Sequence, residues 1–176
     1  NKNVGVGFGA AQYMSASSST QNVFIGHTSG PGAEGAGSST IARNVMIGYE
    51  AGLNSGAVGV TNDNVIVGSN AASTGSFNGD KNVILGTTAG ANMTTGPRNI
   101  LIGYQTGDNI TTAKECILIG YDLDNKDATT SATLNIGNFL TGIDKDNKGD
   151  PQNTNSISIG TGSSLDNISK TFTVSG

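Results

Sequence analysis

The chain has 176 residues, of which 27 are Gly and only 12% are charged, and its formal net charge is −4 at pH 7. Long charged side chains, which usually cover helix surfaces, are scarce, so the composition disfavours a helical protein. The acidic balance excludes nucleic-acid binding through a basic face, because such binding depends on Lys and Arg neutralising phosphates. We therefore expect no nucleic-acid partner.

Nine copies of one short motif, with NVMIG as a typical form, follow one another along the chain. Its closing glycines are 17 to 23 residues apart. The copies occupy residues 3–7, 22–26, 44–48, 64–68, 82–86, 99–103, 116–120, 133–137 and 156–160. A repeat of this length, with one short strand per unit and turn-forming residues between, is typical of a β-solenoid.

The sequence thus predicts an all-β protein: a β-solenoid or β-roll of about nine rungs over residues 1–160. Residues 161–176 depart from the repeat and predict a closing strand or a linker to a further C-terminal domain. Because the chain begins inside a repeat, we expect it to be a fragment. Its longest apolar runs are far shorter than a membrane span, so we expect no membrane insertion by this segment.

The second and fourth residues of each motif point to one face of the strand, and the third residue points to the other. The second and fourth residues are apolar in every well-formed copy, which predicts that they form the core of the coil. These expected core residues are Val23, Ile25, Val45, Ile47, Val65, Val67, Val83, Leu85, Ile100, Ile102, Ile117 and Ile119.

The third residue is large and apolar in six consecutive copies, where a strand with one wet face would carry polar residues. These residues are Phe24, Met46, Ile66, Ile84, Leu101 and Leu118. An exposed stripe of this kind is an aggregation hazard, so we expect it to form the interface of a homotrimer around a shared axis. The alternative, that the stripe packs on the return segment of the same rung, stays open.

The polar residues of the motif have local explanations. The closing glycine lies where the chain turns sharply, and Gly accepts the positive φ that such turns require. The opening Asn recurs at equivalent corners, where it can bond nearby backbone or form a ladder with its copies. Cys116 stands at this Asn position and is the only cysteine, which excludes an internal disulfide and favours a structural role.

The units NVFIGHTSG, NVMIGYEAG, NVILGTTAG and NILIGYQTG resemble repeats of bacteriophage tail fibres and tailspikes, of the kind found upstream of a self-cleaving C-terminal chaperone domain. They are also similar to the β-roll heads of trimeric autotransporter adhesins, whose repeats are shorter and more regular. The resemblance covers about residues 1–160. It implies a homotrimeric virion tail-fibre segment that attaches to the host surface through a glycan or protein receptor. The alternatives are a bacterial cell-surface adhesin head and the non-catalytic part of a polysaccharide-depolymerising tailspike.

An aromatic row directly follows the motif glycine in five copies: Phe8, His27, Tyr49, Tyr104 and Tyr121. Exposed rings offer flat surfaces on which a sugar can stack. This suggests a glycan contact at His27, Tyr49, Tyr104 and Tyr121, and the alternative is that the rings pack over the corners of the coil.

Candidate catalytic and metal-binding residues are scarce. His27 is the only histidine and occupies a ring position of the repeat. Carboxylates are sparse and scattered in the core repeats, which gives little support to a paired-acid site within one chain, although a trimer could assemble such a pair across subunits. The segment DKDNKGD at 144–150 resembles the start of a calcium loop, but Lys148 stands where a ligand belongs. We expect no enzyme activity, no metal and no cofactor, and a solvated, projecting insertion at 144–150.

Overall fold

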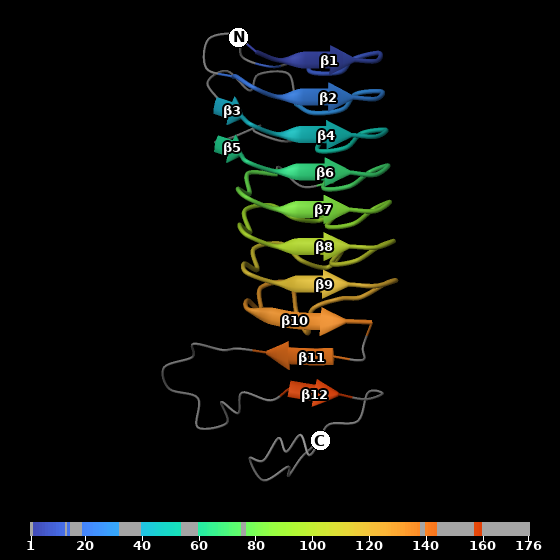
Figure 1. Cartoon of the computed structure of the whole chain (residues 1–176), viewed down its shortest axis with the longest axis vertical. Helices are drawn as coiled ribbons and strands as arrows, with labels where there is room; N and C mark the ends of the chain where they lie inside the picture. Colours follow the sequence, from blue (N-terminus) through green and yellow to red (C-terminus); the bar gives the residue numbers. More distant parts are fainter. Residues whose placement is uncertain are drawn as a thin grey trace, which may run out of the picture.

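The structure is a computed structural model that describes residues 2–12, 14, 19–31, 40–53, 60–74, 77–137, 140–143 and 157–159. Within these ranges every regular element is a strand, and the chain winds into a β-solenoid of about six turns. Figure 1 shows the strands stacked one above another along the long axis, in sequence order. The predicted all-β solenoid is therefore confirmed.

The wall of the solenoid is a parallel sheet with one strand from each repeat. Its strands are β1 (Val4–Val6), β2 (Val23–Ile25), β4 (Val45–Ile47), β6 (Val65–Val67), β7 (Val83–Leu85), β8 (Ile100–Ile102), β9 (Ile117–Ile119) and β10 (Thr133–Ile136). Neighbouring strands pair without a shift, so that Met46 lies opposite Ile66 and Leu101 opposite Leu118. Equivalent residues of the repeat consequently form straight rows along the rod.

A second, smaller sheet was not expected from the sequence. It consists of β3 (Thr40–Ala42) and β5 (Val60–Asn62), which pair in parallel beside the first turns. Both strands lie just before a motif copy, in two of the longer intervals between motifs. These longer units have room for a short extra strand before the corner, which the 17-residue units lack.

The parallel stack ends at β10, and this corrects the expectation of nine rungs. The chain reverses after three residues into β11 (Leu140–Ile143), which pairs antiparallel with β10. The ninth motif forms β12 (Ile157–Ile159), which pairs antiparallel with β11 and does not continue the stack. A three-residue connection is long enough for a hairpin but too short to lead the chain around the coil.

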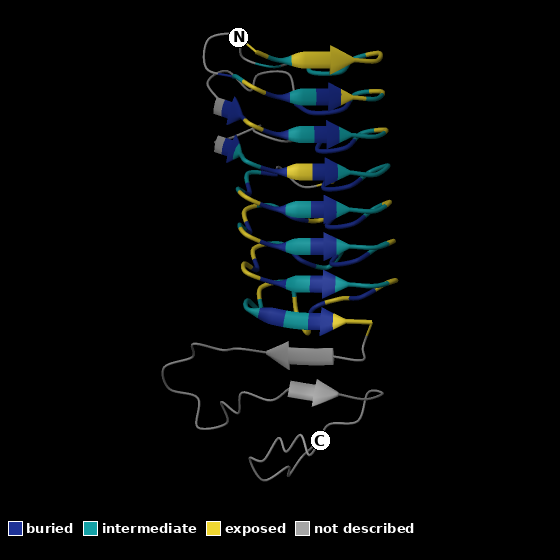
Figure 2. Ribbon diagram, in the orientation of Figure 1, coloured by how far each residue is buried: buried dark blue, intermediate teal, exposed yellow. Residues whose placement is uncertain are grey.

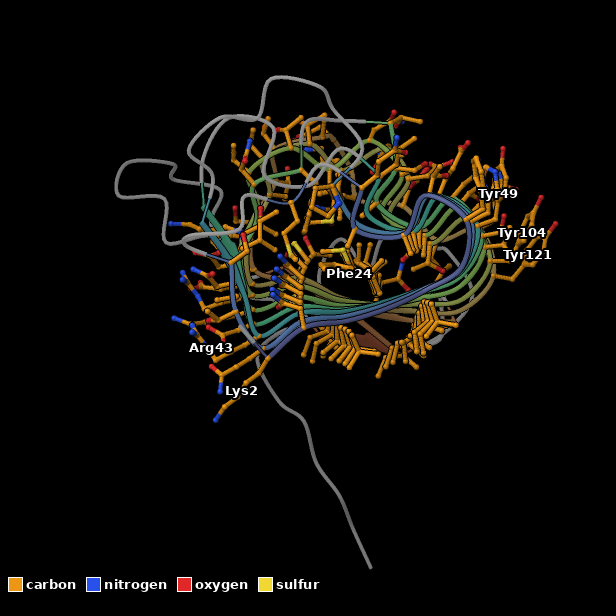
Figure 3. The ribbon with its side chains drawn as sticks, turned by 90° about the horizontal axis from the view of Figure 1, so that it is seen from above. Lys2, Phe24, Arg43, Tyr49, Tyr104 and Tyr121 are labelled. Atoms are coloured by element: carbon orange, nitrogen blue, oxygen red, sulfur yellow. The ribbon has the colours of Figure 1, made fainter. Side chains whose placement is uncertain are left out.

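The two faces of the sheet are the reverse of those predicted. The third residue of each motif fills the core, and we call these residues the inner row: Phe24, Met46, Ile66, Ile84, Leu101 and Leu118, each 0% exposed. The inner row packs with Ile41, Phe77, Met93 and Ile110 in one continuous cluster. Figure 2 shows the buried middle of strands β2 to β9, and Figure 3 shows Phe24 inside the coil.

The residues predicted as core instead line the outside of the sheet and are all partly or largely exposed. They are Val23, Ile25, Val45, Ile47, Val65, Val67, Val83, Leu85, Ile100, Ile102, Ile117 and Ile119. The inner row is covered within a single chain, so it cannot form the trimer interface for which it was proposed. The alternative left open in the sequence, in which this row is covered inside its own chain, matches the burial.

Steric limits explain why one residue per strand fills the coil. The wall opposite the sheet carries the small residues Ala51, Ala71 and Ala89, all fully buried. Gly52 approaches the inner row so closely that a Cβ there would lie 2.5 Å from the Met46 sulfur. Gly48 adopts a φ of 140°, and a Cβ there would meet the Gly68 carbonyl oxygen of the next turn at 2.4 Å. The glycines therefore permit both the turn and the close stacking.

A buried asparagine ladder holds successive turns together, as the repeat predicted. Its members are Asn22, Asn44, Asn64, Asn82 and Asn99. The Asn64 side-chain oxygen accepts hydrogen bonds from the Asn82 backbone N–H at 2.8 Å and from the Asn82 side-chain amide at 3.1 Å. Cys116 ends the ladder: its backbone N–H donates to the Asn99 side-chain oxygen at 2.9 Å, and the residue is fully buried. Its expected structural position is confirmed.

Candidate functional site

The outward side of the parallel sheet carries an apolar surface that extends over seven of its strands. We call it the outer apolar face: the second and fourth motif residues of strands β1, β2, β4 and β6 to β9. Val6 is 54% exposed and Val65 38% exposed, and the others are half-buried or exposed. Aliphatic side chains thus run the length of the wall in two straight rows. A contiguous exposed patch of this kind marks an interaction surface.

A row of charged residues borders one edge of the outer apolar face. We call it the charged row: Arg43, Asp63, Lys81, Arg98 and Glu115, each directly before a ladder position. Every member has a φ of 60° or 61°, the left-handed conformation that turns the chain into the strand. Stacking of the turns places these side chains one above another. The row is therefore fixed by the same corner in each repeat.

Two ion pairs connect neighbouring members of the charged row. Arg43 makes a two-pronged contact with Asp63, with Nε at 2.6 Å from Oδ1 and Nη2 at 2.9 Å from Oδ2. Arg98 donates to Glu115 Oε1 from Nε at 2.9 Å and from Nη2 at 2.5 Å. The hydrogen bond with Asp63 raises the pKa of Arg43, and the same bond lowers the pKa of Asp63.

The aromatic row borders the other edge of the sheet, and the structure brings its rings into two stacks. His27 lies between Phe8 and Tyr49, with ring centroids 5.4 Å and 5.3 Å apart. Tyr104 stacks on Tyr121 with centroids 5.3 Å apart. Ser69 and Thr87 occupy the two turns between the stacks. Figure 3 shows Tyr49, Tyr104 and Tyr121 at the corner opposite Lys2 and Arg43.

The four residues expected to contact a glycan therefore lie in one row, but the stacking occupies much of their flat surface. The Tyr49 and Tyr104 side chains are about half exposed, and Tyr121 is 73% exposed. His27 Nδ1 lies 3.1 Å from the Thr28 hydroxyl oxygen. The hydrogen bond with Glu50 raises the pKa of Tyr49. The glycan contact stays a prediction.

Other expectations fall outside what the structure describes. The segment 144–150, proposed as a solvated insertion, and residues 161–176 belong to that part of the chain. Among the described residues, no three His, Cys, Asp or Glu side chains gather as metal ligands would. The same residues include no helix with the length and apolar character of a membrane span.

Sequence reasoning missed the charged row, although its signal was present. A charged residue directly precedes the motif Asn or its equivalent in five consecutive copies, from Arg43 to Glu115. Read singly, these residues resemble ordinary surface charges. Only the repeat register shows that they lie at one corner.

Comparisons with known proteins add no relative: no protein-family model, curated protein or solved structure matches the chain. The function must therefore be argued from the surfaces described above.

Proposed function

We propose that the chain is a structural and adhesive segment of a homotrimeric phage tail fibre that takes part in attachment to the host-cell surface. The observation that carries the proposal is the outer apolar face, which extends over seven strands with two aliphatic residues in each. The trimer is still supported, but by the outer apolar face, whose residues were predicted to be core and instead need to be covered by other copies. The inner row has no part in it.

A second copy of the chain is the partner that fits this face best. Turns of a β-solenoid repeat at about 4.8 Å, and side chains on the face follow that repeat. An identical copy, aligned in parallel, offers the same period along the whole length. A ring of copies around an axis parallel to the rod also closes, which leaves no apolar face open for filament growth or aggregation.

Lysine substitutions on the outer apolar face test the assembly. The double variant Ile102→Lys and Ile119→Lys places two charges where copies meet, and we expect sedimentation to show single chains that keep the strand signal in circular dichroism. The matched control, Thr95→Lys with Thr112→Lys, adds the same charges at exposed sites outside the strands and should leave the trimer intact. A trimer that survives the Ile102 and Ile119 changes would contradict the proposal.

Attachment requires a separate test. Fluorescently labelled chain is incubated with a panel of bacterial strains, and bound fluorescence is measured by flow cytometry. We expect saturable binding to particular strains, with loss of binding in the lysine variant because single chains lack the avidity of the assembly. Equal, non-saturable binding to all strains would remove the adhesive part of the proposal and leave a spacer.

The alternatives are the head of a bacterial surface adhesin and the non-catalytic part of a polysaccharide-depolymerising tailspike. Both would use the same solenoid and the same outer apolar face. Incubation with purified capsular polysaccharide tests whether the chain itself carries a depolymerase activity, since shortening of the polymer would show an enzyme. We expect the chain length of the polysaccharide to stay unchanged.

A further inference from the structure

Three turns of the repeat carry a cation before the strand and an aromatic ring directly after it. Lys2 and Phe8, Arg43 and Tyr49, and Arg98 and Tyr104 each begin and end one turn's strand, always six residues apart. The pairing does not hold at every turn: Asp63 precedes Ser69 and Lys81 precedes Thr87, and the rings His27 and Tyr121 follow Gln21 and Glu115.

The two positions of each pair cannot meet within one chain. Six residues of extended backbone span about 20 Å. Figure 3, viewed along the rod, shows Arg43 and Lys2 at one edge of the outer apolar face and the labelled tyrosines at the other. Any favourable contact between such a cation and such a ring must therefore form between copies.

Rotational symmetry brings these two edges together. In a ring of copies around an axis parallel to the rod, the right edge of one face meets the left edge of the next, and the contact is heterologous. Rotation about that axis adds no shift along the rod, so each turn meets the same turn of its neighbour. Arg43 of one copy would then face Tyr49 of the next, and Arg98 would face Tyr104.

The ion pairs prepare the arginines for this contact. Guanidinium N–H groups donate within the plane of the group, so the bonds from Arg43 to Asp63 hold the plane and leave its faces open. The Arg43 and Arg98 side chains stay 51% and 49% exposed in these pairs. A guanidinium held in this way keeps N–H groups that can donate to a tyrosine hydroxyl group beside it, and such a bond is stronger where water is excluded.

We propose that the charged row and the aromatic row form the seam between neighbouring copies, with Arg43 beside the ring of Tyr49 and Arg98 beside the ring of Tyr104 of the adjacent chain. The proposal rests on the proposed homotrimer and adds its register and its polar contacts. The occupant of both edges is a second, parallel copy of this chain. The seam excludes the expected glycan contact on Tyr49 and Tyr104, because rings held between copies offer no face to a sugar.

Cross-linking in solution tests the seam. The matched variant carries Arg43→Cys and Tyr49→Cys, and a short bismaleimide joins thiols that lie within its reach. We expect covalent trimers as the main product on a denaturing gel. Cys116 is fully buried, so the reagent reaches only the introduced thiols. The mismatched control, Arg43→Cys with Tyr104→Cys, separates the thiols by three turns, or about 14 Å along the rod, and should give no covalent trimer.

The outcomes distinguish failure of the proposed seam from failure of the proposed fibre function. A trimer by light scattering that cross-links through neither pair, nor through the second matched variant Arg98→Cys with Tyr104→Cys, overturns the seam and leaves the fibre proposal standing. Cross-linking of the mismatched pair alone indicates staggered copies and also overturns the seam. A chain that is monomeric in its unmodified form removes the proposed function and the seam together.

Discussion

Buried amide side chains explain why Asn opens the motif. Each ladder Asn accepts a hydrogen bond from the backbone N–H of the next turn with its side-chain oxygen, and the amide of Asn64 donates to the Gly79 carbonyl at 2.9 Å. These groups have no access to water, so an unpaired donor or acceptor would be costly. The ladder therefore fixes the register between turns as well as contributing stability.

Removal of one ladder residue should show this cost. Asn64→Ala leaves the backbone N–H of Asn82 and the carbonyl of Gly79 without partners, and at about 1–3 kcal/mol for each buried group we expect a loss of about 2–6 kcal/mol. Urea unfolding measures it. Asn92→Ala, at an exposed site on the same solenoid, serves as the control and should cost clearly less. Equal losses in the two variants would show that the ladder has no special role.

Asp127 supplies a prediction about pH. Hydrogen bonds from Thr130 and from Thr129 lower the pKa of Asp127 to about 2. A carboxylate with a lowered folded pKa contributes stability above its unfolded pKa of 3.8, and that contribution is lost as the pH falls towards 2. We expect the carboxyl carbon of Asp127 to titrate in NMR with a midpoint near 2. A midpoint near 4 would mean that the turn bonds are absent in solution.

At the level of the strand, the sequence predicted the period and the position of each element but not which face lies inside. Alternation along the strand places the second and fourth residues on one face and the third on the other. When both sets are apolar, it cannot tell which face lies in the core. The deciding information was the size of the opposite wall. Ala51 and Ala71 are fully buried and Gly52 lies against Met46, so small residues keep this wall close to the inner row.

The same limit explains the other differences at this scale. A short hairpin between β10 and β11 turned the ninth motif out of the stack, although SISIG has the correct pattern. The aromatic row is a feature that the sequence predicted in part. The positions of the rings were predicted, because the register of the repeat is printed in the sequence, but their mutual stacking depends on the unshifted pairing of the turns.

A pair of substitutions in β8 tests the assignment of the two faces. Leu101→Asp places an unpaired charge in the core, at a cost of several kcal/mol, comparable to the whole stability of a small domain. We expect it to abolish the strand signal in circular dichroism. Ile102→Asp points outwards and should keep that signal while weakening the assembly. The reverse result, a folded Leu101→Asp and an unfolded Ile102→Asp, would restore the face assignment predicted from the sequence.

On the scale of the whole molecule, one face of a straight rod carries its apolar residues in register, bordered by cations and anions on one edge and rings on the other. Under the proposed function this surface receives parallel copies of itself, because it repeats with each turn. Burial of aliphatic side chains contributes about 25 cal/mol per Å² of apolar area removed from water. A face of seven strands is therefore a strong basis for assembly.

The mass of the unmodified chain in solution, measured by multi-angle light scattering, tests the central claim most directly. The claim that copies cover the outer apolar face predicts a particle of three times the chain mass of 17.7 kDa. The value should persist on dilution into the low micromolar range. A stable, soluble particle with the mass of one chain would contradict the claim, because the outer apolar face would then tolerate water along its whole length.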